Sequence, residues 1–183
     1  MPRRDDLNTI LVLGSGPIKI GQAAEFDFSG SQAVRALRED GYEVILVNSN
    51  PATIQNDPEM ADRVYIEPLL PDTVRKILEI EKPDALLAGM GGQTALNIAS
   101  ELSHDGTLER LGVELIGSDL DAIDKAEDRE LFNQVCESID LPISQAIACN
   151  SMEEVIKAAE ELGSWPILIL SLIHISEPTR HRR

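Results

Sequence analysis

The chain has 183 residues, which suits one domain or one and a fraction, because a domain takes roughly 100 to 200 residues. Hydrophobic residues make up 43% and charged residues 26%, so we expect a folded chain rather than a disordered one. The formal net charge of −16 would repel a nucleic-acid backbone, and no apolar run approaches the roughly 20 residues that span a bilayer. We expect neither nucleic acid nor a membrane as partner, and the start, which lacks a secretory signal, predicts a cytoplasmic location.

Residues that ligate metals or act as nucleophiles are sparse. The two cysteines, Cys136 and Cys149, lack CxxC spacing and neighbouring histidines, so we expect buried, inert thiols rather than a zinc site or a disulfide framework. Of the three histidines, His174 and His181 lie in residues 170–183, which are considered separately below. The remaining one, His104, is expected in a polar loop, and one histidine makes no catalytic constellation.

Short apolar runs alternate with stretches of helical spacing in the first two thirds of the chain. The runs are rich in Val, Ile and Leu and occupy residues 10–13, 44–47, 64–66, 85–88 and 113–116. Such runs predict buried parallel strands. Helices are predicted between them: one that stops at Gly41, one over 72–81 and one over 93–102. This alternation predicts an α/β fold with a doubly wound parallel sheet.

From residue 119 the pattern becomes rich in helix and predicts the start of a second unit. Apolar residues follow a helical period from Leu131 to Ile139, and Ser151 with Glu154 has the spacing of a capping box that opens a helix reaching about residue 162. Residues 143–149 and 167–169 are predicted strands. This unit has only about fifty residues, too few for a stable domain of its own.

Residues 170–183 do not resemble the end of a natural domain. They begin LSLIHISEPTR, which is the translation of a common transposase sequencing adapter. We expect the biological sequence to end at about Ile169, and the rest to be an artefact of sequence assembly. The alternative is a genuine apolar strand followed by a basic terminus. Because residues 167–175 are largely apolar, we also expect the chain to aggregate through this end.

The turn after the first predicted strand, GSGPIKIG at residues 14–21, is a candidate phosphate loop, since glycine permits close approach of the backbone to a ligand. It matches neither GxGxxG nor a P-loop ending in GKS or GKT. A dinucleotide site would also place Asp or Glu after the second strand, where this chain has Asn48. Glycines that serve only the turn are the alternative.

A second glycine-rich turn, GMGGQT at residues 89–94, follows another strand and leads into a helix, so its amides could meet an anion. Since the carboxyl ends of parallel strands meet at one edge of a sheet, we expect both turns to converge on a cleft there. Arg129 is a candidate phosphate clamp, and a solvated ion pair among its acidic neighbours is the alternative.

Six stretches resemble one family in a single register: GSGPI at 14–18, GQAAEFD at 21–27, VNSNPAT at 47–53, DPEMAD at 57–62, MGGQTALN at 90–97 and DKAEDR at 124–129. Together, from Met1 to about Ile169, the chain resembles the start of the large subunit of carbamoyl phosphate synthetase. The resemblance implies a Rossmann-like pre-ATP-grasp domain over residues 1–118 and the truncated start of an ATP-grasp domain over residues 119–169, before the suspect residues 170–183.

The resemblance implies a cytoplasmic ATP-dependent ligase of arginine and pyrimidine biosynthesis, which makes carbamoyl phosphate from bicarbonate, glutamine-derived ammonia and two ATP. Its cofactor ATP acts with Mg or Mn, and its partners are a glutaminase small subunit and the remainder of the large subunit. Arg129 matches the family arginine that contacts ATP, while Gln22, Ala23 and Glu25 match a segment near the ammonia passage. The resemblance assigns no catalytic residue and no metal ligand to this chain.

The sequence departs from the family after Ile169, where the family continues with Arg-Pro-Ser-Phe and a glycine-rich loop over the ATP phosphates and this chain has Leu170. A second ATP-binding arginine and the metal ligands are therefore missing, which implies that the chain alone is inactive. Two alternatives stay open. One is a biotin carboxylase, which residues 48–53 fit less well, and the other is a non-enzymatic acidic module that binds a nucleotide through its glycine turns.

Overall fold

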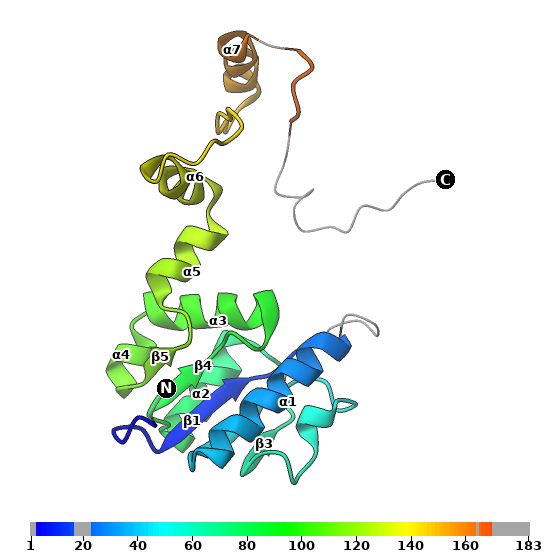
Figure 1. The fold of residues 1–183 in the computed structure, drawn as a ribbon, viewed down its shortest axis with the longest axis vertical. Helices are drawn as coiled ribbons and strands as arrows, with labels where there is room; N and C mark the ends of the chain where they lie inside the picture. Colours follow the sequence, from blue (N-terminus) through cyan, green and yellow to red (C-terminus); the bar gives the residue numbers. More distant parts are fainter. Residues whose placement is uncertain (1–2, 17–22, 164, 170–183) are drawn as a thin grey trace. The chain divides into compact units, whose positions relative to one another are not determined.

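The computed structural model describes residues 3–16, 23–163 and 165–169, and its first part is built on a five-stranded sheet (Figure 1). The strands are β1 Thr9–Leu13, β2 Glu43–Val47, β3 Arg63–Tyr65, β4 Ala85–Leu87 and β5 Glu114–Ile116. They lie in the order β3-β2-β1-β4-β5, and every neighbouring pair is parallel. The chain starts at the centre of the sheet and winds outward both ways, which confirms the doubly wound α/β fold.

Helices cover the sheet through two hydrophobic clusters. The helices of this part are α1 Ala23–Glu39, α2 Pro71–Glu81, α3 Gly92–His104, α4 Thr107–Leu111 and α5 Leu120–Glu127, with a short 3-10 helix η1 Ile54–Asn56. Val34 of α1 packs in the cluster that contains Ile10 and Val12, whereas α2, α3 and α4 pack with Leu11 and Leu13. Because successive strand residues enter opposite clusters, β1 is buried on both faces, which explains its continuous apolar run.

Local chemistry sets the helix ends. Pro71 occupies the first turn of α2, and Lys82 closes it in the left-handed conformation at φ 48° just before Pro83. The sequence did not predict α4, a helix of five residues bounded by Gly106 and Gly112, both at positive φ. A helix this short is too brief to show an apolar period.

Residues 132–183 separate from residues 1–131 as a second compact unit, whose helices are α6 Arg129–Ser138, which spans the division, and α7 Met152–Leu162. The capping box is confirmed, since Ser151 Oγ accepts from Glu154 N at 3.3 Å. The return bond comes one residue early, from Asn150 N to Glu154 Oε2 at 2.7 Å. The strands predicted at 143–149 and 167–169 are wrong, because the described residues of this unit provide no neighbouring strand to pair with.

Membrane insertion finds no support in the described helices, none of which combines the length and the apolar character that crossing a bilayer demands.

Candidate functional site

The glycine turn after β1 is tied to the end of β2. Gly14 N donates to Val47 O at 2.8 Å, which extends the β1–β2 ladder by one bond. Gly16, at φ +67°, then turns the chain, and its N–H donates to Asn48 Oδ1 at 3.0 Å. A Cβ on Gly14 would lie 2.8 Å from the Asn48 side chain, so glycine is required there by contact with the protein itself.

Asn48 stands where a dinucleotide site would carry its acidic residue, and it has a structural role. The residue is fully buried, and its Nδ2 donates to Thr53 Oγ1 at 3.0 Å. Its backbone N–H donates to Tyr65 O at 2.9 Å, which joins it to the end of β3. An amide committed to the protein in this way is not available to a ribose, so the geometry counts against a dinucleotide site.

The second glycine turn lies against the first, as expected, and the backbones of the two turns are in close-packed contact. A Cβ on Gly91 would lie 2.5 Å from Gly14 O and 2.9 Å from Leu13 O, so only glycine lets the start of α3 approach the end of β1. Gly92 adopts φ +64°, whereas a Cβ on Gly89 would meet nothing within 4 Å. The glycines at 91 and 92 are therefore explained by packing and turn geometry, and Gly89 is the one with open space.

The first turn of α1 is held by the segment that follows β2. Asp27 accepts through its two carboxylate oxygens from Ile54 N at 3.0 Å and Gln55 N at 3.1 Å. Gln55 Nε2 donates to Phe26 O at 2.9 Å. Gln55 is fully buried and lies against Gly30 of α1, where a Cβ would be 2.5 Å from Nε2.

Asn48, Asp27 and Gln55 have structural roles that the sequence did not predict. The sequence signal is the mostly polar segment from Asn48 to Asn56, which directly follows an apolar strand and is longer than an ordinary turn.

The structure places three of the four predicted site residues in elements of the fold. Ala23 opens α1, and Glu25 is exposed in its first turn, where its carbonyl accepts from Ser29 Oγ at 2.9 Å. Gln22 lies outside the described residues. Arg129 opens α6, whose first turn is capped by Asp128 Oδ1, but its side chain also lies outside the described part.

An open groove of about 600 Å³ lies between α3 and α5 and is lined by Asn97, Ser100, Glu101, His104, Asp105, Ile123, Asp124 and Glu127. His104 is the last residue of α3, so its expected place in a loop is wrong. Asp124 lies between Ser100 Oγ and His104 Nε2, at 3.1 Å from each. A nucleophilic serine would need the histidine itself as its hydrogen-bonded base, so this arrangement is not a hydrolytic triad.

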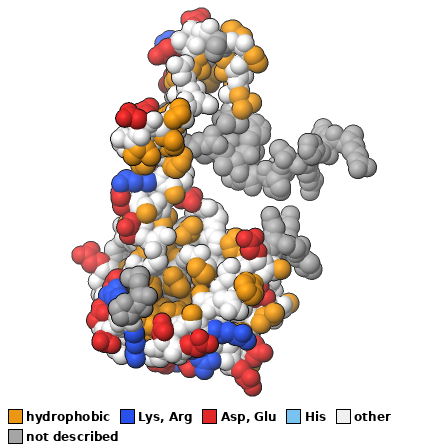
Figure 2. Space-filling view, viewed as in Figure 1, with side chains coloured by type: hydrophobic (Ala, Val, Ile, Leu, Met, Phe, Trp, Pro, Cys, Tyr) orange, Lys and Arg blue, Asp and Glu red, His pale blue; other side chains and the backbone are white. Residues whose placement is uncertain are grey.

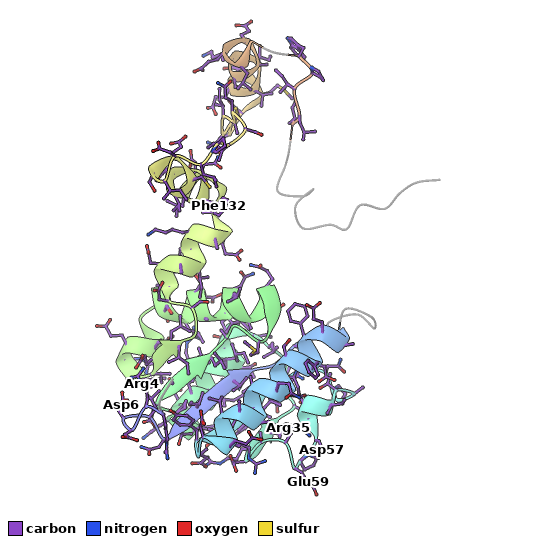
Figure 3. All side chains as sticks on the ribbon, in the orientation of Figure 1. Arg4, Asp6, Arg35, Asp57, Glu59 and Phe132 are labelled. Carbon is purple, nitrogen blue, oxygen red and sulfur yellow. The ribbon has the colours of Figure 1, made fainter. Side chains whose placement is uncertain are left out.

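Within the described ranges, no three His, Cys, Asp or Glu side chains come together as a metal ion would require. Both cysteines are free thiols: Cys136 is buried, as expected, and Cys149 is only partly buried. A second groove, of about 340 Å³, lies beside β5 and the start of the chain. Arg4, in its lining, pairs with Asp6, which lies next to it in Figure 3, and also with Glu114. Neither groove is lined by the glycine turns at 14–16 and 89–92.

Comparison with known proteins gives one consistent family. Residues 6–125 match the family model of the carbamoyl phosphate synthase preATP-grasp domain. Over 169 residues, 92% of this chain, it is 59% identical to the carbamoyl phosphate synthase large chain of Synechocystis sp. and 58% identical to the large chain, N-terminal section, of Aquifex aeolicus. The chain spans 16% and 30% of the lengths of these two relatives.

Solved structures with the same fold share far less sequence. The biotin carboxylase domain of a single-chain bacterial carboxylase is matched with a TM-score of 0.63 at 13% identity, over 89% of this chain and 36% of that one. The biotin carboxylase domain of Hydrogenobacter thermophilus 2-oxoglutarate carboxylase, solved with MgADP, ADP and bicarbonate, gives 0.59 at 18% identity, over 86% and 33%. These likenesses establish the fold, and the much higher identity to the synthases decides the family. The chain therefore belongs to the carbamoyl phosphate synthase large-chain family and carries its preATP-grasp domain.

Proposed function

We propose that this chain supplies the N-terminal part of a synthase that makes carbamoyl phosphate from bicarbonate, glutamine-derived ammonia and two ATP. The observation that carries the proposal is the 59% identity over 169 residues to a large chain, against 13% and 18% to the two carboxylases. Because the chain spans only 16% of that relative, we propose that it has no synthase activity alone.

The proposed chemistry begins with transfer of a phosphoryl group from ATP to bicarbonate, which gives carboxyphosphate and ADP. Ammonia then attacks the carboxyl carbon and phosphate leaves, so that carbamate forms, and a second ATP phosphorylates carbamate. Divalent metal offsets the phosphate charge in such transfers. The described residues contain no cluster suited to that metal, so its ligands are assigned to the rest of the large chain.

Within this scheme we assign ATP contact to Arg129. It opens α6, and its guanidinium is a permanent cation whose planar fork suits phosphate oxygens. The start of α1, with Gln22, Ala23 and Glu25, is assigned to the ammonia passage, where the exposed Glu25 carboxylate can accept a hydrogen bond from ammonia or ammonium. A glutaminase small subunit, a cytoplasmic location and roles in arginine and pyrimidine biosynthesis complete the proposal.

The same proposal includes the artefactual origin of residues 170–183, which lie outside the described residues. The matched length of 169 residues equals the number that precede Leu170, which supports it. Sequencing the source DNA across the Leu170 codon tests this part alone: a reading frame that continues with Arg-Pro-Ser-Phe is the expected result, and a stop codon after Arg183 contradicts it.

The function is tested with a chimera in which residues 1–169 replace the matching segment of the Synechocystis large chain. In cells that lack their own large chain, we expect the chimera to restore growth without arginine and uracil. The matched control is the same chimera with Arg129→Ala, which should fail to restore growth. A chimera that is folded and well expressed, but leaves the cells dependent on added arginine and uracil, would contradict the proposed function.

A further inference from the structure

The two faces of the five-stranded sheet are covered unequally. Three helices, α2, α3 and α4, pack side chains against the face that carries Leu11 and Leu13. On the opposite face, which carries Ile10 and Val12 and is called the α1 face below, α1 is the one helix of the described residues that contributes to the cluster. Helix α1 contacts β2, and Figure 1 shows no helix in front of β4 and β5. The half of the α1 face formed by β4 and β5 is therefore open.

The apolar side chains on this half of the α1 face are only partly buried. Leu87 of β4 and Ile116 of β5 pack against the cluster and stay partly exposed, whereas Ile10 of β1 is 1% exposed. Gly117 follows β5 beside Leu87, and a Cβ there would lie 3.0 Å from Leu87 Cδ1, so residue 117 brings no side chain to cover it. Parallel sheets occur almost only with both faces covered. The described residues do not provide that cover over β4 and β5.

The groove of about 340 Å³ lies on this open half. Leu37 of α1 and Ile116 of β5 both line it. The charged residues in its lining already have partners within the chain: Arg4 pairs with Glu114 at 2.6 Å, and Asp119 caps the first turn of α5. Figure 2 shows hydrophobic side chains open to solvent on this face of the first unit. The groove is therefore suited to an apolar occupant and not to a charged one.

We propose that an apolar segment of the rest of the large chain, from beyond residue 169, packs into this groove and completes the α1 face. The chain spans 16% of the Synechocystis large chain, so most of that polypeptide lies outside it. A second copy fits worse, because each copy carries a net charge of −16 and the two would repel. An apolar contact whose charges are paired on one side is typical of permanent association, as between parts of one subunit.

The test places a thiol in the groove, as Leu37→Cys or Ile116→Cys, with Cys149→Ser as background because Cys149 is only partly buried. Reaction with a maleimide is followed by mass spectrometry of the peptide that carries the thiol, in the 183-residue chain and in the purified Synechocystis chimera. Labelling of both thiols should be slower in the chimera by about tenfold or more. The matched control is Glu109→Cys, exposed on α4, which should react at the same rate in both proteins.

A photoreactive cross-linker attached at Leu37→Cys then identifies the occupant, and cross-linked peptides from the Synechocystis part of the chimera are expected. Equal labelling of the groove thiols in chain and chimera overturns the inference. Protection that requires added glutaminase small subunit overturns it too, as does protection that rises with the concentration of the 183-residue chain alone. Protection in a chimera that forms no carbamoyl phosphate would keep the inference and contradict the proposed function, so the two failures are distinguishable.

Discussion

Two glycines of one turn have opposite tolerances for a side chain. A Cβ on Gly91 would clash with two backbone oxygens, Gly14 O and Leu13 O, which cannot rotate away, whereas Gly89 has open space and no positive φ. Gly91→Ala should therefore lower the free energy of unfolding by about 1–3 kcal/mol or more, the usual range for overpacking. Gly89→Ala should change it by less than about 0.5 kcal/mol. Urea unfolding of both variants checks this, and equal losses would contradict the packing account.

At the residue scale, the sequence predicted which glycines matter for the fold, but not the contacts that require glycine there. The glycines at 14–16 and 89–92 follow strands in a pattern that is visible in the chain. The contact between Gly91 and Gly14, by contrast, joins residues far apart in the sequence and depends on β1 and β4 being neighbours. The roles of Asn48 and Gln55 escaped prediction for the same reason, because Asn48 is bonded by Gly16 in the turn after β1 and Gln55 bonds Phe26 of α1.

Among the elements, the prediction was best where burial alone determines the structure. All five strands of the first part were predicted, since each contributes apolar side chains to both hydrophobic clusters, although the edge strands β3 and β5 are only partly buried. The strands at 143–149 and 167–169 failed because a strand also depends on its neighbour, and the short helices η1 and α4 show no period. Helix α7 was predicted correctly because its capping box is local.

An ion pair links α2 to the turn between α3 and α4. Asp105 accepts from Thr107 N at 2.8 Å and from Arg75 Nη2 at 2.7 Å. Hydrogen bonds from Thr107 and then from Arg75 lower the pKa of Asp105 from 3.8 to about 2. Because the folded pKa lies below the unfolded one, this carboxylate stabilises the fold above about pH 4, and the contribution is lost as the pH falls through about 2.

Asp105→Asn should therefore lower the free energy of unfolding at neutral pH, and its difference from the unsubstituted chain should shrink as the pH falls from about 4 to about 2. Asp121→Asn is the control, because Asp121 is exposed and, among the described residues, pairs just with Lys125 of its own helix. Urea unfolding across this pH range checks the prediction. A deficit for Asp105→Asn that is as large at pH 2 as at neutral pH would show that the ionised carboxylate is not the cause.

At the scale of the whole molecule, the two units differ in how well they bury apolar side chains. The first unit encloses two hydrophobic clusters, whereas apolar side chains gather on the surface of the second (Figure 2). Phe132 is 52% exposed, and Trp165 and Leu168 are each 79% exposed. An unpaired apolar segment of this kind invites association with another chain.

A version that ends at Gly163 should therefore stay monomeric at concentrations where the full chain aggregates. A version that ends at Ile169 is the control, since it keeps Leu168 and lacks only residues 170–183. Its aggregation should be intermediate between that of the Gly163 version and that of the full chain. Light scattering over a concentration series measures this. Equal aggregation of the Gly163 version and the full chain would show that the residues after Gly163 are not the cause of aggregation.

The central claim is that residues 1–169 form a working preATP-grasp part of a carbamoyl phosphate synthase. The most direct measurement is the transfer of labelled carbon from bicarbonate into carbamoyl phosphate by the purified chimera, with ammonium and ATP supplied. The account predicts ATP-dependent formation of labelled product, and none from the 183-residue chain alone. A chimera that folds and yet forms no labelled carbamoyl phosphate would contradict it.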